Sequence, residues 1–202
     1  AVIGALIAAI GLYVYQRIGP SAAPTGPVDT AESALAAASK GKTDAGAALR
    51  NVKMAGSILT VKNGESIQAA VSKAKPGDTI QVMPGLYKET VYIDKDNIAI
   101  VGVIDKGAWP VMDGERKLND AILYSGSGIR IENMKIVHYK GNAIMGQAGN
   151  NFIIRYNWIV DTGVYGIFPQ FGKNGLVEYN VISGIADAAI YIGMCDNIQV
   201  SN

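Results

Sequence analysis

The feature that most constrains the fold of this chain is a repeat in its C-terminal part. Four short apolar segments each end in asparagine: IRIEN (129–133), IIRYN (153–157), LVEYN (176–180) and IQVSN (198–202). The asparagines are 24, 23 and 22 residues apart, and the first three segments are each followed by a second apolar segment. Glycine and asparagine interrupt the stretches between them, so no long helix fits there. A period of this length made only of strands predicts a parallel β-helix, an all-β solenoid with one repeat per coil.

The asparagines themselves are expected to stack. Strands of successive coils lie about 4.8 Å apart, so equivalent side chains sit directly above one another. An asparagine tolerates the left-handed backbone of a sharp turn, and its amide can bond to the amides above and below it. We therefore predict one vertical ladder, formed by the side chains of Asn133, Asn157, Asn180 and Asn202.

Composition excludes several classes of function. The 202 residues carry a formal net charge of +1, which provides no basic footprint for a nucleic acid. The single cysteine, Cys195, rules out a disulfide within the chain, and the single histidine, His138, rules out a histidine-rich metal centre. We expect no metal site and no cofactor. Acid–base chemistry would have to depend mainly on carboxylate, tyrosine or lysine side chains.

The N-terminal segment 1–18 is predicted to be a transmembrane helix. Its first fifteen residues, AVIGALIAAIGLYVY, contain no charged side chain, and Gly19 and Pro20 end the segment. A signal peptide is the alternative, but the basic region that precedes its apolar core is missing. We expect a membrane anchor that places the rest of the chain on the periplasmic or extracellular face.

Residues 19–56 are predicted to be a linker rich in Pro, Gly and Ala. The stretch 19–30 has the composition of an extended spacer. Short helices are expected after Thr30 and over 44–53, with mostly alanine on their faces. They serve either as a spacer or as a surface that packs against a partner subunit in a membrane complex.

The remaining segment, 57–202, is expected to be the β-helix domain, with one amphipathic helix over Ser66–Ala74 at its start. The stretch ESIQAAVSKAKPGDTIQVMPGLYKETVYI (65–93) resembles the entrance of the right-handed parallel β-helix proteins of the pectin-lyase-like type, and NIAIVG (97–102) is similar to their next coil. This resemblance implies a right-handed coil whose N-terminal helix caps the first turn. We expect the coil to continue past Asn202 or to be covered there by a partner.

A second, more distant resemblance concerns YGIFPQ (165–170). It is similar to the catalytic strand Tyr-Gly-Phe-Asp-Pro-His of the alginate epimerases. The positions that supply an acid and a base in that family hold Phe168 and Gln170 here, and neither side chain titrates. The resemblance therefore implies a related strand without that activity.

Three residues are candidates for catalysis. His138 and Asp161 both follow an Ile-Val pair and lie 23 residues apart, so they are expected to stack, with the carboxylate orienting the imidazole. Asp187 lies 26 residues beyond Asp161, which places it out of register by about three positions. A solvated pair in a turn is the alternative interpretation.

Four residues are candidates for binding a sugar: Tyr165, Gln147, Gln170 and Trp158. Aromatic rings stack on sugar rings, and glutamine amides donate and accept hydrogen bonds. Tyr156 and Tyr179 are in register and are expected to stack on each other instead.

Together these features favour a membrane-anchored, extracytoplasmic β-helix module with a structural or binding role, such as an accessory subunit of a membrane complex. The alternative is a polysaccharide lyase or epimerase acting on acidic glycans, and a third hypothesis is a surface adhesin. The expected partners are the membrane, through residues 1–18, subunits of such a complex, and a glycan.

Overall fold

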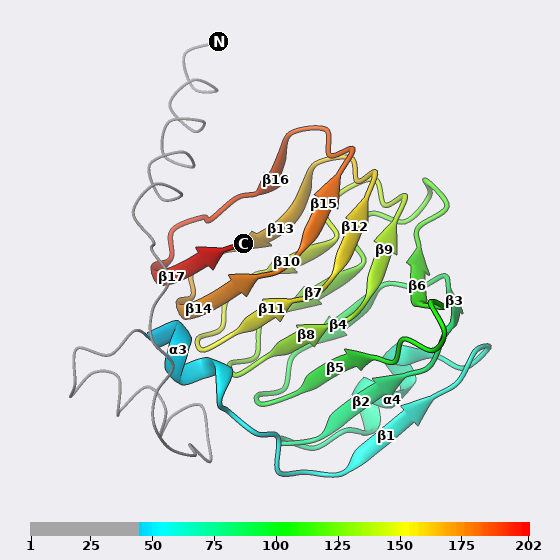
Figure 1. The fold of residues 1–202 in the computed structure, drawn as a ribbon, viewed down its shortest axis with the longest axis horizontal. Helices are drawn as coiled ribbons and strands as arrows, with labels where there is room; N and C mark the ends of the chain where they lie inside the picture. The colour runs from blue at the N-terminus through cyan, green and yellow to red at the C-terminus, as the bar shows by residue number, and fades with distance from the viewer. Residues whose placement is uncertain (1–44) are drawn as a thin grey trace.

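The computed structural model describes residues 45–202, which form a parallel β-helix built from three sheets (Figure 1). The first sheet has seven strands: β1 (Ile58–Val61), β2 (Thr79–Val82), β5 (Ala99–Gly102), β8 (Arg130–Glu132), β11 (Ile153–Arg155), β14 (Lys173–Glu178) and β17 (Asp196–Ser201). The second has five: β3 (Gly85–Tyr87), β6 (Pro110–Asp113), β9 (Lys135–Val137), β12 (Trp158–Val160) and β15 (Val181–Ser183). The third also has five: β4 (Val91–Ile93), β7 (Ile122–Tyr124), β10 (Ile144–Gly146), β13 (Tyr165–Pro169) and β16 (Ala188–Ile190).

From β2 to β16 the chain visits the three sheets in turn, so that each of these coils adds one strand to each sheet. Strand neighbours pair in parallel, and Ile154 lies opposite Ile131 on one side and Val177 on the other. The coils in this part of the protein therefore take 23 residues each, a length that also separates the atoms of many inter-coil hydrogen bonds. The prediction of an all-β parallel β-helix is confirmed.

The hydrophobic core fills the interior of the coil, where similar side chains stack above one another from coil to coil. Alternate residues of a strand point to opposite faces, so every second position faces inward. The inward columns are almost entirely aliphatic and fully buried, as in Ile80, Ile100, Ile131, Ile154 and Val177 of the first sheet. Burying each such side chain contributes roughly 1.5–3 kcal/mol to stability.

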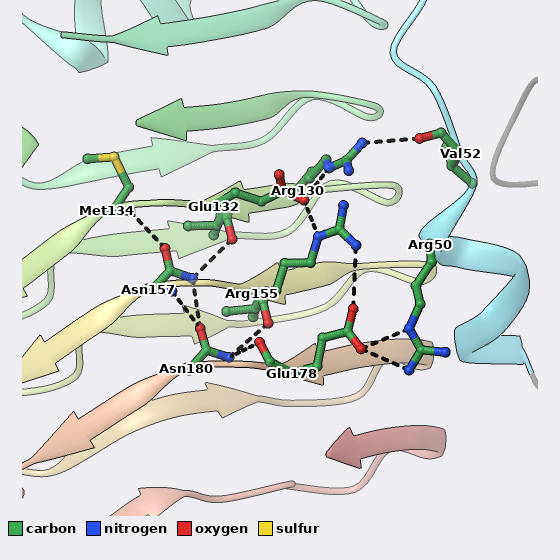
Figure 2. Close-up of polar contacts among 11 residues, drawn as sticks. Arg50, Val52, Arg130, Glu132, Met134, Arg155, Asn157, Glu178 and Asn180 are labelled. Carbon is green, nitrogen blue, oxygen red and sulfur yellow. Dashed lines mark hydrogen bonds and ion pairs between the residues drawn. The ribbon is translucent and has the colours of Figure 1, made fainter. Parts of the chain in front are cut away.

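The predicted asparagine ladder is wrong in two of its four members. Because the coil length is 23 residues, the 24-residue and 22-residue spacings each shift the asparagine by one position. Asn157 and Asn180 do stack: the Asn157 Nδ2 donates to Asn180 Oδ1 at 3.0 Å. The Asn157 Oδ1 accepts from the backbone N–H of Met134, which is the residue in register one coil earlier. Figure 2 shows this short ladder.

Asn133 and Asn202 instead occupy the neighbouring turn position. The residues there in the two coils between them are Tyr156 and Tyr179, and all four positions have a positive φ of 53–63°. The two tyrosine rings stack with centroids 5.3 Å apart and an interplanar angle of 11°. The predicted tyrosine stack is therefore confirmed.

A short helix, α4 (Ile67–Lys73), occurs within the range predicted for the amphipathic helix. Ser66 is its N-cap and accepts a hydrogen bond from the Ala69 N–H at 3.1 Å. Ile67 and Val71 are one turn apart and both are buried against the first coil.

A second helix, α3 (Ala45–Arg50), lies on the outer face of the first sheet against β14 and β17 (Figure 1). Leu49 is fully buried there with Ile153 and Leu176. No helix within residues 45–202 is long and apolar enough to cross a membrane. The predicted anchor over 1–18 and the linker as far as residue 44 lie outside the described residues.

Candidate functional site

The third sheet presents an outward column of large apolar side chains along the axis of the coil. Tyr92, Leu123, Met145 and Phe168 lie in register on β4, β7, β10 and β13. Tyr191 follows directly after β16 and continues the column, because its ring stacks on Phe168 with centroids 4.9 Å apart. We call these five residues the third-sheet column. They point outward because the alternate positions of the same strands fill the core.

At the C-terminal end of the third-sheet column, Tyr165 joins Phe168 and Tyr191 in a cluster of three aromatic rings. Its ring meets Phe168 edge-on at 4.7 Å and lies 5.0 Å from Tyr191. All three rings are partly exposed. Partial burial, followed by the charge and the hydrogen bond of Asp187, raises the pKa of Tyr165. Asp187 therefore belongs to this cluster and does not join His138 and Asp161.

Gln147 and Gln170 directly follow β10 and β13, at the C-terminal ends of these two strands of the third sheet. They are in register, since Gly146 lies opposite Pro169 one position earlier. Their backbone N–H groups continue the ladder, donating to Tyr124 and Gly146 carbonyls at 2.8 and 2.9 Å. Within residues 45–202 neither side-chain amide makes a hydrogen bond, so both amides are available to a ligand.

Trp158, the fourth predicted binding residue, is on a different face. It begins β12 in the second sheet, where the edge of Trp109 meets it at 5.9 Å and the Lys135 ammonium lies 3.7 Å from its ring centroid. The structure thus brings Tyr165, Gln147 and Gln170 together on the third sheet and separates Trp158 from them. A lysine on one ring face also makes Trp158 a poor platform for a sugar.

His138 and Asp161 stack as predicted, at the turn that follows the second sheet. Both have a φ of 58°, and Gly184, with a φ of 68°, occupies the same position in the next coil. The His138 Nε2 lies 3.9 Å from Asp161 Oδ2, which is close but beyond hydrogen-bond distance, so Asp161 does not hold the imidazole by a hydrogen bond as predicted.

Two residues that the sequence did not reveal complete this group. Asp113 ends β6, and its Oδ1 lies 3.0 Å from His138 Nδ1. Arg116 forms an ion pair with Asp161 Oδ2. Neither residue is 23 positions from its partner: Asp113 is 25 residues before His138, and Arg116 is 45 residues before Asp161. The repeat therefore gave no signal of them.

The surroundings of Asp113 favour the ionised form of its carboxyl group. Partial burial alone would raise its pKa, but the Glu115 N–H, the His138 hydrogen bond and the positive charges of His138 and Lys88 lower it below its ordinary value. The Glu115 N–H donates to Asp113 Oδ1 at 2.8 Å.

In the described part of the chain, no group of three His, Cys, Asp or Glu side chains is arranged to hold a metal ion.

The first sheet carries a different kind of surface, a ladder of buried ion pairs beneath residues 45–54 (Figure 2). Glu132 accepts from the Nε atoms of Arg130 and Arg155 at 2.5 and 2.6 Å. Glu178, whose side chain is 1% exposed, accepts from Arg155 at 3.4 Å and from Arg50 of the α3 helix at 2.8 Å. Arginines of the chain itself therefore pair with both carboxylates, which makes the ladder a structural contact.

The comparisons with known proteins agree with this architecture. Residues 115–202 match a protein-family model described as the right handed beta helix region. The searches of curated proteins and of solved structures returned no match. The match and the three parallel sheets together show that residues 45–202 have a right-handed parallel β-helix fold.

Proposed function

We propose that this protein is a β-helix module with a binding role, and that it binds an extended glycan along the third-sheet column. The observation that carries the proposal is the cluster of partly exposed rings of Tyr165, Phe168 and Tyr191, flanked by unengaged amides of Gln147 and Gln170. Aromatic faces contribute stacking area, and amides supply the directed hydrogen bonds that sugar hydroxyls need.

The shape of the column suits a polymer. Its members repeat at the strand spacing of about 4.8 Å, so the surface is a straight strip along the coil axis rather than a closed pocket. Such a strip can contact several consecutive sugar units at once, which gives useful affinity from individually weak contacts. Phe168 and Gln170 stand at the two positions that hold the acid and the base in the similar strand of the alginate epimerases, and neither of them titrates.

We further propose that residues 1–18 anchor the module in a membrane and place the coil on the periplasmic or extracellular face. In this setting the module would act as an accessory subunit of a membrane complex that handles polysaccharide. The support is the uncharged apolar stretch at the start of the sequence.

The binding proposal is tested by incubating the full 202-residue chain, in detergent, with an array of acidic and neutral polysaccharides. Phe168→Ala should reduce retention at least tenfold. The matched control is Tyr179→Ala, which removes an exposed ring of similar size from another face. Equal retention of both variants, or no retention of the unaltered chain, would refute binding at this column.

A second candidate is supported by a specific observation, the alignment of Asp113, His138 and Asp161. A histidine held by a carboxylate is a common proton-transfer group, and a polysaccharide lyase or epimerase needs one. This candidate predicts turnover of acidic polysaccharides, seen as an unsaturated or inverted sugar product, that is lost in His138→Ala. Binding without turnover would favour the first proposal.

A further inference from the structure

His138 contacts two carboxylates unequally, and the difference fixes the roles of its two nitrogens. The Nδ1 atom is 3.0 Å from Asp113 Oδ1, a hydrogen bond, whereas Nε2 is 3.9 Å from Asp161 Oδ2, which is not. An ionised carboxylate can only accept. The proton of a neutral His138 is therefore expected on Nδ1, which leaves the lone pair of Nε2 exposed toward solvent beside Asp161.

Arg116 adds a cation next to this lone pair. Its side chain is 71% exposed and pairs with Asp161 through one nitrogen. A guanidinium has five N–H donors in a fork that suits carboxylates, so most of its capacity is unused. An arriving carboxylate can take the remaining donors or replace Asp161, and either arrangement brings the ligand beside His138 Nε2.

The other charges near the group are paired among themselves. Glu115 lies between Lys88 at 2.6 Å and Lys117 at 3.4 Å. The Asp113 carboxylate has His138 and the Glu115 N–H as its hydrogen-bond partners. Of the side chains in this group, Arg116 is therefore the cation best placed to meet an incoming anion.

We propose that this turn is a proton-accepting site for a carboxylate-bearing ligand: Asp113 positions His138, His138 Nε2 accepts the proton, and Arg116 holds the ligand carboxylate. In the transfer, a bond to hydrogen in the ligand breaks, its electron pair stays on the ligand, and the proton moves to Nε2. The imidazolium formed is stabilised by ionised Asp113, and the return of the proton restores the site without any co-reactant. The binding of the ligand and the proton transfer do not depend on the second candidate function. Only the reaction that follows the transfer, lyase or epimerase chemistry, rests on it.

The role of Asp113 is tested by long-range proton–nitrogen NMR of the full chain, in which His138 is the only histidine signal. At a pH where the ring is neutral, the expected form carries its proton on Nδ1. Asp113→Ala should remove that preference, and Asp161→Ala, the matched control, should keep it. A proton on Nε2 in the unaltered chain, or a response to the Asp161 change alone, would overturn the assignment.

The role of Arg116 is tested by titrating the same sample with glucuronate and, as the uncharged control, glucose. Glucuronate should shift the His138 ring signals and glucose should not, and Arg116→Met should reduce the glucuronate shift at least tenfold at equal concentration. No glucuronate shift would overturn the ligand assignment. If both NMR results are as expected and no polysaccharide is turned over, the second candidate function fails while the site stands.

Discussion

Asn157 and Asn180 are joined across one coil by two hydrogen bonds, from the Asn157 backbone N–H and from its side-chain Nδ2, both to Asn180 Oδ1. The Asn157 Nδ2 also donates to the Ile131 carbonyl at 3.1 Å. Asn157 is buried, with 1% of its surface exposed. These contacts tie three consecutive coils together at the turn between the first and second sheets.

Asn157→Ala should therefore destabilise the coil strongly. It leaves the buried Met134 N–H and Ile131 carbonyl without their partner, and each unsatisfied group costs about 1–3 kcal/mol. Urea unfolding should show a loss of about 2–5 kcal/mol in the free energy of unfolding.

The control for that change is Asn133→Tyr, which places a tyrosine where the next two coils already have one. The substituted ring should extend the stack of Tyr156 and Tyr179, and stability should change by less than about 1 kcal/mol. Equal losses for the two variants would mean that the ladder is not specific to the Asn157 column.

Glu178 should be essential to the attachment of residues 45–54. Replacing it with alanine removes the partner of both Arg50 and Arg155, and breaking a buried ion pair typically costs about 3–5 kcal/mol. Hydrogen exchange at the amides of α3 should accelerate together with the loss of global stability.

The control for Glu178→Ala is a change in an exposed ion pair. Lys173 and Asp196 are 3.4 Å apart with side chains 64% and 74% exposed, and such pairs contribute about 0–1 kcal/mol. Asp196→Ala should leave the exchange of α3 amides unchanged. If it matches the effect of Glu178→Ala, burial is not what gives the ladder its strength.

Acid should weaken the fold partly through Asp78. Its carboxylate accepts from the backbone N–H groups of Lys75 and Ser57 at 2.8 and 2.7 Å, and these bonds lower its pKa. A lowered pKa in the folded state gives stability that is present above the ordinary value of about 3.9 and is lost as the pH falls toward the folded value.

The measurement is the free energy of unfolding between neutral pH and pH 3 for the unaltered chain and for Asp78→Asn. The variant should be less stable at neutral pH, and the gap between the two should narrow as the pH falls. A gap that stays constant in acid would show that Asp78 does not contribute through its charge.

The repeat period was enough to predict the architecture, because a 23-residue recurrence of apolar segments leaves few alternatives. The Tyr156–Tyr179 stack and the His138–Asp161 stack also followed from that period alone. The ladder failed at Asn133 and Asn202 for a physical reason: asparagine suits both the turn position with positive φ and the position after it, so the residue type does not report its register.

Other features had no sequence signal that could reveal them. Asp113 lies opposite Val137 and meets His138 from one position out of register, so the 23-residue period does not pair the two. The ion-pair ladder of Glu132 and Glu178 reads in the sequence as ordinary charged residues on strands. The sequence does not show that Arg50 of α3 meets Glu178 there. Trp158 was grouped with Tyr165 by residue type, although the two are on different sheets.

The central claim, that a glycan lies along the third-sheet column, is tested most directly by methyl NMR of the full chain labelled at its six methionines. Met145 is in the column, Met112 is buried behind the second sheet, and both tryptophans that the chain contains lie at the second sheet. Adding the polysaccharide retained on the array should shift the Met145 methyl signal and leave the Met112 signal and the tryptophan fluorescence unchanged. A change in tryptophan fluorescence with an unmoved Met145 signal would contradict the claim.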